Sequence, residues 1–254
     1  MRRHRFYRKD FVSTHTLLEG RDITHQVSRV LRMKTGEEIV IWNGDGKEYV
    51  FMVETISAKG VRGRVARIEE NTSEPSVRVT LYCALLKREN FETVCQKATE
   101  AGVSGIVPLM TERTVKVKIH SDRVRKIIQE AAEQSGRARI PVLCDAMSFS
   151  EALKTCEGIE RVIFFDTAQN DISHDRCLPG PQAGRKPDVI RDPLAQGLGM
   201  AEIIHIFIGP EGGWSDTERA AAQKAGLDTR SLGPLTLRAE TAAIVASYLA
   251  AHGL

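Results

Sequence analysis

The stretch FIGPEGGWSDTE, residues 207–218, decides the fold because it joins an apolar run to a helix start through a glycine-rich turn. The run IIHIFI, residues 203–208, is typical of a central parallel strand. Ser215 and Glu218 have the spacing of a capping box, which predicts that a helix begins there. A turn between a strand and a helix is a common ligand site in α/β proteins, so the question is what this turn holds.

The residues of the turn exclude the two best-known phosphate cradles. No Lys-Ser or Lys-Thr follows the glycines, as a P-loop requires, and the spacing is not GxGxxG. Pro210 also removes one backbone N–H donor. Glycines let a ligand approach the backbone closely, so the turn suits an uncharged flat group such as adenine. On spacing alone, a plain connecting turn is an equal alternative.

From residue 77 onward, strands alternate with helices. VRVTLYCALL, GIVPLM and RVIFFD read as buried strands, and the segments between them have helical periodicity. This alternation predicts an α/β domain with a mostly parallel sheet over residues 77–254. Residues 167–200 hold four prolines and four glycines and are predicted to be a mobile, exposed loop.

The first 72 residues have a different pattern, with β-rich runs on both sides of a hairpin turn signal at 43–46, Asn-Gly-Asp-Gly. A helical stretch before them places Ile23, Val27, Val30 and Leu31 on one face. We therefore expect a small β-barrel that carries one short helix. The polar segment 69–76 is the predicted linker to the second domain.

A second glycine-containing turn lies at 232–243, LGPLTLRAETAA, again between a short strand and a helix. Arg238 at the helix start is well placed to stabilise an anion, because the helix dipole is also positive there. The alternative is a surface ion pair between Arg238 and Glu240, which would contribute little. Two such turns after parallel strands predict one shared crevice at the carboxyl edge of the sheet.

Composition narrows the class of protein. The net charge is +3, and Arg2, Arg3, Arg5, Arg8 and Lys9 lie among aromatic residues at the N-terminus. Such a segment suits an RNA backbone with exposed bases, and a frayed solvated terminus is the alternative. The five cysteines have no CxxC spacing, no His/Cys cluster predicts a metal, and no apolar run is long enough for a bilayer. Without a signal peptide, we expect a cytoplasmic protein.

Five motifs, in order along nearly the whole chain, resemble the RsmE family of 16S rRNA uridine N3-methyltransferases in the SPOUT superfamily. They are VSRVLRMKTGEEI, QKATEAGVSGIVPLMTERT, EAAEQSGRARIP, IGPEGGWSDTE and LGPLTLRAET. The resemblance implies a PUA-like β-barrel at 1–72 and a SPOUT-type α/β domain at 77–254 with a C-terminal trefoil knot. It also implies S-adenosylmethionine as cofactor, a homodimer, and 16S rRNA, in an assembled 30S subunit, as the partner.

The family's functional positions carry over onto matching residues of this sequence. Arg238 would stabilise the uridine anion, and Glu240 would accept a proton or orient Arg238. The cofactor walls would be Phe165 with Asp166, Ile208, Gly209, Glu211, Gly212, Gly213, Leu232, Gly233, Leu235, Leu237 and Thr241. RNA contacts would come from Arg2, Arg3, Arg5, Arg8, Arg29, Arg32, Lys34, Arg137 and Arg139. The loop after Asp166 is longer than the family pattern.

Two alternatives to this function stay open at the level of sequence. The first is a SPOUT RNA methyltransferase with another target, such as a ribose hydroxyl or a tRNA base. The second is a non-catalytic RNA-binding factor for ribosome assembly, which would bind no cofactor.

Overall fold

The computed structural model describes residues 4–14, 16–114, 119–167 and 202–253. Arg2, Arg3 and nearly all of the predicted loop 167–200 lie outside the described residues. The chain divides into two compact units. Unit 1 consists of Met1–Glu74 with Ala132–Ile140, and unit 2 consists of Pro75–Ala131 with Pro141–Leu254.

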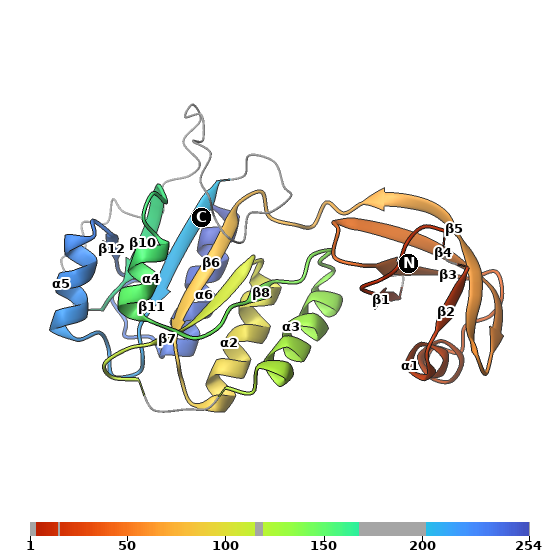
Figure 1. The fold of residues 1–254 in the computed structure, drawn as a ribbon, viewed down its shortest axis with the longest axis horizontal. Coiled ribbons are helices and arrows are strands. Elements are labelled where there is room, and N and C mark those ends of the chain that lie inside the picture. Colours follow the sequence, from red (N-terminus) through yellow and green to blue (C-terminus); the bar gives the residue numbers. More distant parts are fainter. Residues whose placement is uncertain (1–3, 15, 115–118, 168–201, 254) are drawn as a thin grey trace. The chain divides into compact units, whose positions relative to one another are not determined.

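Unit 1 contains a five-stranded sheet in the order β1-β3-β4-β5-β2 (Figure 1). Its strands are β1 (Arg5–Tyr7), β2 (Leu17–Glu19), β3 (Glu38–Trp42), β4 (Lys47–Ser57) and β5 (Gly60–Glu70). Strands β3 and β4 are antiparallel on either side of the turn 43–46, so the predicted hairpin is confirmed. The core beneath the sheet is formed by buried side chains that include Ile23, Val27, Ile39, Phe51 and Val61.

The short helical segment of unit 1 differs from the prediction at Val30. Helix α1 (Arg21–His25) continues as the π-helix η1 (Gln26–Val30), in which the Leu31 N–H donates to the Gln26 carbonyl over 2.8 Å. The wider turn rotates the following residues by about one position. Ile23 and Val27 are fully buried as predicted, but Val30 is 61% exposed, so its placement on the buried face was wrong.

One part of unit 1 comes from far along the chain. The Glu74 carboxylate accepts hydrogen bonds from the backbone N–H groups of Ala138 and Arg139, both at 3.0 Å. It also pairs with the Arg137 guanidinium at 2.8 Å. Segment Ala132–Ile140 therefore belongs with the N-terminal unit, whereas the predicted division placed it in the domain at 77–254.

Unit 2 contains a parallel sheet in the order β12-β10-β11-β6-β7-β8, with β9 also paired to β7 (Figure 1). The strands are β6 (Arg78–Ala84), β7 (Gly105–Met110), β8 (Val142–Leu143), β9 (Met147–Ser148), β10 (Arg161–Phe165), β11 (Ile203–Ile208) and β12 (Asp228–Arg230). Each of the strand pairs in this sheet is parallel, so the predicted α/β arrangement is confirmed.

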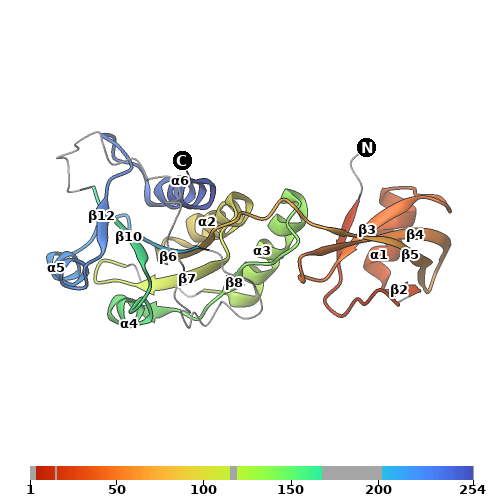
Figure 2. The same cartoon turned by 90° about the horizontal axis from the view of Figure 1, so that it is seen from above.

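Helices cover both faces of this sheet. Figure 2 shows α2 and α6 together on one face and α4 and α5 on the other. The helices are α2 (Arg88–Ala101), α3 (Ser121–Ser135), α4 (Phe149–Thr155), α5 (Asp216–Lys224) and α6 (Ala239–His252). The periodicity of α2 was read correctly, since Phe91, Val94, Cys95, Ala98 and Ala101 are all buried.

Strand register brings the functional segments to one edge. Phe165 at the end of β10 lies opposite both Arg230 of β12 and Ile208 of β11. Ile208 in turn lies opposite Cys83 of β6. Because the strands are parallel, the segments that follow β10, β11 and β12 all begin at this carboxyl edge.

Candidate active site

The first glycine-rich turn, Gly209–Gly213, connects β11 to α5 in a fixed conformation. The Gly213 N–H donates to the Pro210 carbonyl over 2.9 Å, and Gly213 has a left-handed φ of 68°. The predicted capping box is present, with Ser215 accepting from the Glu218 N–H and Glu218 accepting from the Ser215 N–H. The start of α5 is therefore fixed by two reciprocal hydrogen bonds.

Trp214 explains why residue 209 is a glycine. A Cβ atom at Gly209 would lie only 2.9 Å from the Trp214 ring. The indole is buried, donates its Nε1–H to the Phe165 carbonyl over 2.9 Å, and packs 4.6 Å from the ring of Phe164. In the structure, the close approach that Gly209 permits is thus to an indole of the same chain, and the sequence interpretation missed Trp214.

The other side of this turn is contacted from the loop after β7. Arg113 donates from Nη1 to the Gly212 carbonyl over 2.8 Å. The neighbouring Glu112 N–H donates to Glu218 Oε1 over 3.0 Å. Sequence reasoning missed Arg113, because its partner is 99 residues away in the chain.

The second turn, between β12 and α6, is held by fewer contacts. Ser231 Oγ donates to the Gly233 carbonyl at 3.0 Å, and Gly233 has a φ of 126°. Leu232, Gly233 and Leu237 are half-buried, whereas Leu235 is 76% exposed. Leu235 is therefore an apolar side chain exposed to solvent at the carboxyl edge of the sheet, where it is available to contact a ligand or a partner.

Arg238 and Glu240 stand at the start of α6 without contacting each other. Arg238 is the N-cap residue, is exposed, and forms no ion pair within the described ranges of the chain. Glu240 Oε2 is buried, and no group in the described part of the chain donates to it. The surface ion pair considered as an alternative is therefore not formed, and Thr241 beside them is exposed.

The end of β10 forms the third side of this edge. The Asp166 N–H donates to the Arg230 carbonyl over 2.9 Å, which joins the start of the long loop to the end of β12. The Asp166 carboxylate is buried and accepts from Arg219 Nε at 2.7 Å. This hydrogen bond raises the pKa of Arg219. Asp166 thus holds α5 against the sheet, and its carboxylate is already occupied.

Glu211 adds a negative charge to the same edge. Its side chain is exposed, and its charge reaches the buried thiol of Cys83 at the end of β6. Burial first, and then this charge, raise the pKa of Cys83 to about 12. The thiol is therefore neutral near pH 7, and Cys83 acts as a packing residue.

The predicted RNA-binding residues that the structure describes fall into three groups. Arg29, Arg32 and Lys34 are exposed in unit 1, and Arg32 has a left-handed φ of 51°. Arg5, in contrast, pairs with Glu48 and donates to the Arg137 carbonyl, and Arg137 is buried against Glu74. The guanidinium groups of Arg8 and Arg139 donate to backbone carbonyls, that of Tyr7 at 3.0 Å and that of Asp45 at 3.4 Å.

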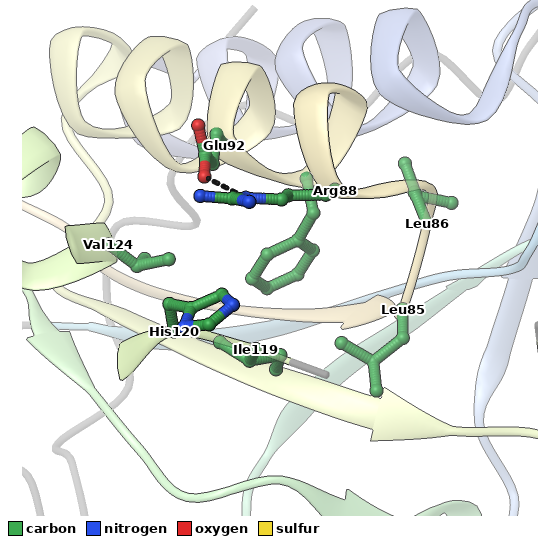
Figure 3. Close-up of a pocket in the computed structure, with 8 residues that line it drawn as sticks. Leu85, Leu86, Arg88, Glu92, Ile119, His120 and Val124 are labelled. Carbon is green, nitrogen blue, oxygen red and sulfur yellow. Dashed lines mark hydrogen bonds and ion pairs between the residues drawn. The ribbon is translucent and has the colours of Figure 1, made fainter. Parts of the chain in front are cut away.

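A small cavity lies beside the start of α2 and is lined by Leu85, Phe91, Val124 and other side chains (Figure 3). Arg88 closes one side through its 3.1 Å hydrogen bond to Glu92. Its volume of about 10 Å³ is near the minimum for one water molecule, so it cannot hold a cofactor. Of the residues predicted to bind cofactor or RNA, none lines it.

Two kinds of feature are absent from the described residues. No helix among them is both long and apolar enough to span a bilayer. No three His, Cys, Asp or Glu side chains in the described ranges gather as a metal site would require.

Comparison with known proteins identifies the class. A family model for the RNA methyltransferase domain matches residues 72–251, and a model for the RNA methyltransferase PUA domain matches residues 28–66. The parallel sheet with two turns at one edge is thus an RNA methyltransferase domain, preceded by a PUA domain.

Individual relatives narrow this class of RNA methyltransferase to one family. Ribosomal RNA small subunit methyltransferase E from Synechocystis is 31% identical over 224 residues, which cover 87% of this chain and 68% of the relative. A Legionella pneumophila protein solved with the bound cofactor SAM is 31% identical, with a TM-score of 0.78 over 100% of both chains. The chain belongs to the ribosomal RNA small subunit methyltransferase E family, so the resemblance predicted from the five motifs is confirmed.

A further solved structure supports the fold. Ribosomal RNA small subunit methyltransferase E from Neisseria gonorrhoeae, bound to S-adenosyl methionine, is 24% identical with a TM-score of 0.78 and covers 97% of this chain and 95% of that one.

Proposed function

We propose that this protein methylates N3 of a uridine in 16S rRNA, the family's position 1498, with S-adenosylmethionine as the methyl donor. The observation that carries the proposal is that two turns, after β11 and after β12, begin at the same carboxyl edge of the sheet on either side of β10. When bound, the cofactor supplies an activated methyl group on a sulfonium. The chain must then supply a binding wall and a way to make N3 nucleophilic.

The residues at this edge fit such a cofactor. The backbone N–H groups of Glu211 and Gly212 donate to no group in the described part of the chain, so they are free for the edge of an adenine. Exposed Leu235 offers an apolar contact, and the unpaired oxygen of Glu240 offers a negative charge to a cationic ligand. We propose that Phe165, Ile208, Gly213, Leu237 and Thr241 complete the walls.

Arg238 is the residue that we propose for the electrostatic part of the chemistry. N3 of uracil carries a proton and is not nucleophilic until that proton is lost. The resulting anion spreads its charge over O2 and O4, which a guanidinium can stabilise. Arg238 is exposed at the N-terminus of α6, and its guanidinium forms no ion pair with Glu240. Methyl transfer then requires alignment of the reactants, for which no metal is needed.

Glu240 is the second proposed catalytic residue. Its buried Oε2 accepts a hydrogen bond from no group in the described part of the chain, so this oxygen is available to accept the N3 proton. Orientation of Arg238 is the other role considered for it. The structure does not favour that role, because the two side chains form no ion pair in the described ranges.

RNA contact is proposed for the exposed basic residues of unit 1, namely Arg29, Arg32 and Lys34, and for the half-buried Arg8 and Arg139. Arg2 and Arg3 retain the proposal from sequence alone. Arg5 and Arg137 are removed from it, because their guanidinium groups are held by carboxylates inside unit 1. N3 lies on the pairing edge of uracil, so the target base must be unpaired when it is methylated.

Four further parts of the proposal concern the oligomeric state, the chain topology, the location and the form of the substrate. We propose a homodimer, supported by an apolar groove of about 400 Å³ along α2 and α6 in which Tyr248 is 49% exposed. We also propose a trefoil knot in the C-terminal segment, a cytoplasmic location, and the assembled 30S subunit as substrate. These follow from the family, and size-exclusion chromatography with light scattering tests the dimer.

Methylation of isolated 30S subunits and of naked 16S rRNA tests the function. The expected result is 3-methyluridine, detected by nucleoside mass spectrometry, with faster transfer to the assembled subunit. Methylation at a ribose hydroxyl would identify another target class. Failure to bind S-adenosylmethionine in calorimetry, by a folded protein, would support a non-catalytic assembly factor instead.

A further inference from the structure

The Gly212 carbonyl lies at the middle of the first turn and is held by one side chain from outside it. Arg113 Nη1 donates to this carbonyl at 2.8 Å. The aliphatic stem of Arg113 also lies against Gly212, since a Cβ atom there would be 3.4 Å from Arg113 Cβ and 3.6 Å from Cδ. The guanidinium and the stem of Arg113 thus both contact this residue.

Holding this carbonyl has a consequence for the free donors of the turn. Glycine has access to more backbone conformations than other residues, so the peptides around Gly212 can rotate unless something restrains them. The Glu211 and Gly212 N–H groups are the donors proposed to face the cofactor, and they are next to the restrained carbonyl. The Gly212 carbonyl belongs to the Gly212–Gly213 peptide, and fixing this peptide limits rotation of the two peptides before it. Less entropy is then lost when a ligand binds to their N–H groups.

Arg113 itself is anchored to the same helix start. Its turn is closed by the Thr111 N–H, which donates to Thr114 Oγ1 at 3.0 Å. Next to it, the Glu112 N–H donates to Glu218 Oε1, while the other Glu218 oxygen accepts from the Ser215 N–H at 2.9 Å. The contacts therefore form a closed ring that runs from the loop after β7 through α5 to the glycine-rich turn and back through Arg113.

We propose that Arg113 is a positioning residue that pre-organises the glycine-rich wall for S-adenosylmethionine. This rests on the proposed function, because it assigns the wall to that cofactor. Arg113 acts through the Gly212 peptide, not on the reacting atoms. Its loss therefore weakens cofactor binding and leaves the chemical step and RNA affinity unchanged.

The test compares Arg113→Met, which keeps the aliphatic stem and removes the guanidinium, with Arg113→Lys, which keeps a positively charged N–H donor. Calorimetry with S-adenosylmethionine and with S-adenosylhomocysteine is expected to show roughly 10-fold weaker binding of both by the Met variant. The Lys variant is expected to recover most of this loss. The KM for the cofactor rises to match, while kcat at saturating cofactor and the KM for 30S subunits stay at wild-type values.

Arg125→Met is the matched control, since Arg125 is an exposed arginine of α3 whose nearest carboxylate is 3.6 Å away. It is expected to change none of these quantities. Unchanged cofactor affinity in Arg113→Met would overturn the proposal, and so would a loss confined to the KM for 30S subunits, which would make Arg113 an RNA contact. If the wild-type protein itself binds no cofactor, the proposed function fails first.

Should the Met variant fold poorly, the Lys variant and Arg113→Gln decide the matter by the same affinities. Equal binding by wild type, Lys and Gln variants would again overturn the proposal.

Discussion

The two turns at the carboxyl edge of unit 2 differ in how firmly the protein alone holds them. The turn 209–213 is packed on Trp214, tied to Arg113, and ends in a complete capping box. The turn 231–238 exposes Leu235 and ends at Arg238, which caps α6 with no side-chain hydrogen bond. The first turn is thus fixed by contacts within the chain, while the second leaves an apolar and a charged side chain exposed.

This difference separates two kinds of mutational effect. Changes at Trp214 and at Gly209, which packs on it, should appear mainly in folding stability, because the indole is part of the core. Changes in the second should appear mainly in binding and turnover, because its side chains have few contacts within the described chain. Five variants test this distinction.

Trp214→Ala should have the largest effect. It removes a fully packed indole and leaves the Phe165 carbonyl without its donor. We expect the free energy of unfolding of unit 2 to fall by about 3–5 kcal/mol. Urea denaturation followed by circular dichroism measures this change. A loss below about 1 kcal/mol would mean that the first wall is not anchored by this residue.

Arg238→Ala tests the second turn by activity. Removal of an exposed, unpaired guanidinium should leave the melting temperature and the affinity for S-adenosylmethionine near their wild-type values. Turnover at saturating substrates should fall by roughly 100-fold, as for loss of a group that stabilises a developing anion. Collapse of cofactor binding in calorimetry would place Arg238 in the pocket wall instead.

Gly209→Ala and Gly212→Ala compare two positions within the first turn. A methyl group at 209 would lie 2.9 Å from the buried Trp214 ring, whereas at 212 it would meet only the exposed side chain of Arg113 at 3.4 Å. We expect Gly209→Ala to lower stability by about 1–3 kcal/mol. Gly212→Ala should stay within about 0.5 kcal/mol of wild type. Equal melting temperatures would contradict the packing explanation for Gly209.

Leu235→Ser should have the smallest effect. Because Leu235 is 76% exposed, its loss should change stability by no more than about 0.5 kcal/mol. Loss of a partial apolar contact should weaken cofactor binding by roughly 5-fold. Calorimetry measures the affinity and thermal denaturation the stability. A drop in melting temperature as large as that of Gly209→Ala would show that the second turn is also part of the core.

The features that were predictable from sequence are those with a local signal. The capping box at Ser215, the parallel strands and the buried face of α2 follow from spacing and periodicity, which depend on neighbours within a few residues. The convergence of the two turns was also predictable, because parallel strands end at one edge.

What could not be predicted depends on partners that are distant in the chain. Arg113 reaches Gly212 because β7 and β11 lie on either side of β6 in the folded sheet, and Arg137 is buried because it pairs with Glu74. The exposure of Val30 follows from a π-turn, which changes the helical period that the prediction assumed. A signal for Trp214 was present, because a large apolar residue between the glycines and the N-cap Ser215 is expected to be buried. Its hydrogen-bond partner, the Phe165 carbonyl, could not be predicted from the sequence.

The return of residues 132–140 to unit 1 has a consequence for biosynthesis. A ribosome makes a chain from its N-terminus, and domains generally fold as they emerge. Here the carboxylate of Glu74 is synthesised long before the backbone groups of Ala138 and Arg139 that it binds. The N-terminal unit therefore cannot complete its contacts until more than half of the polypeptide has been translated. A fragment cut at the linker would lack those partners permanently.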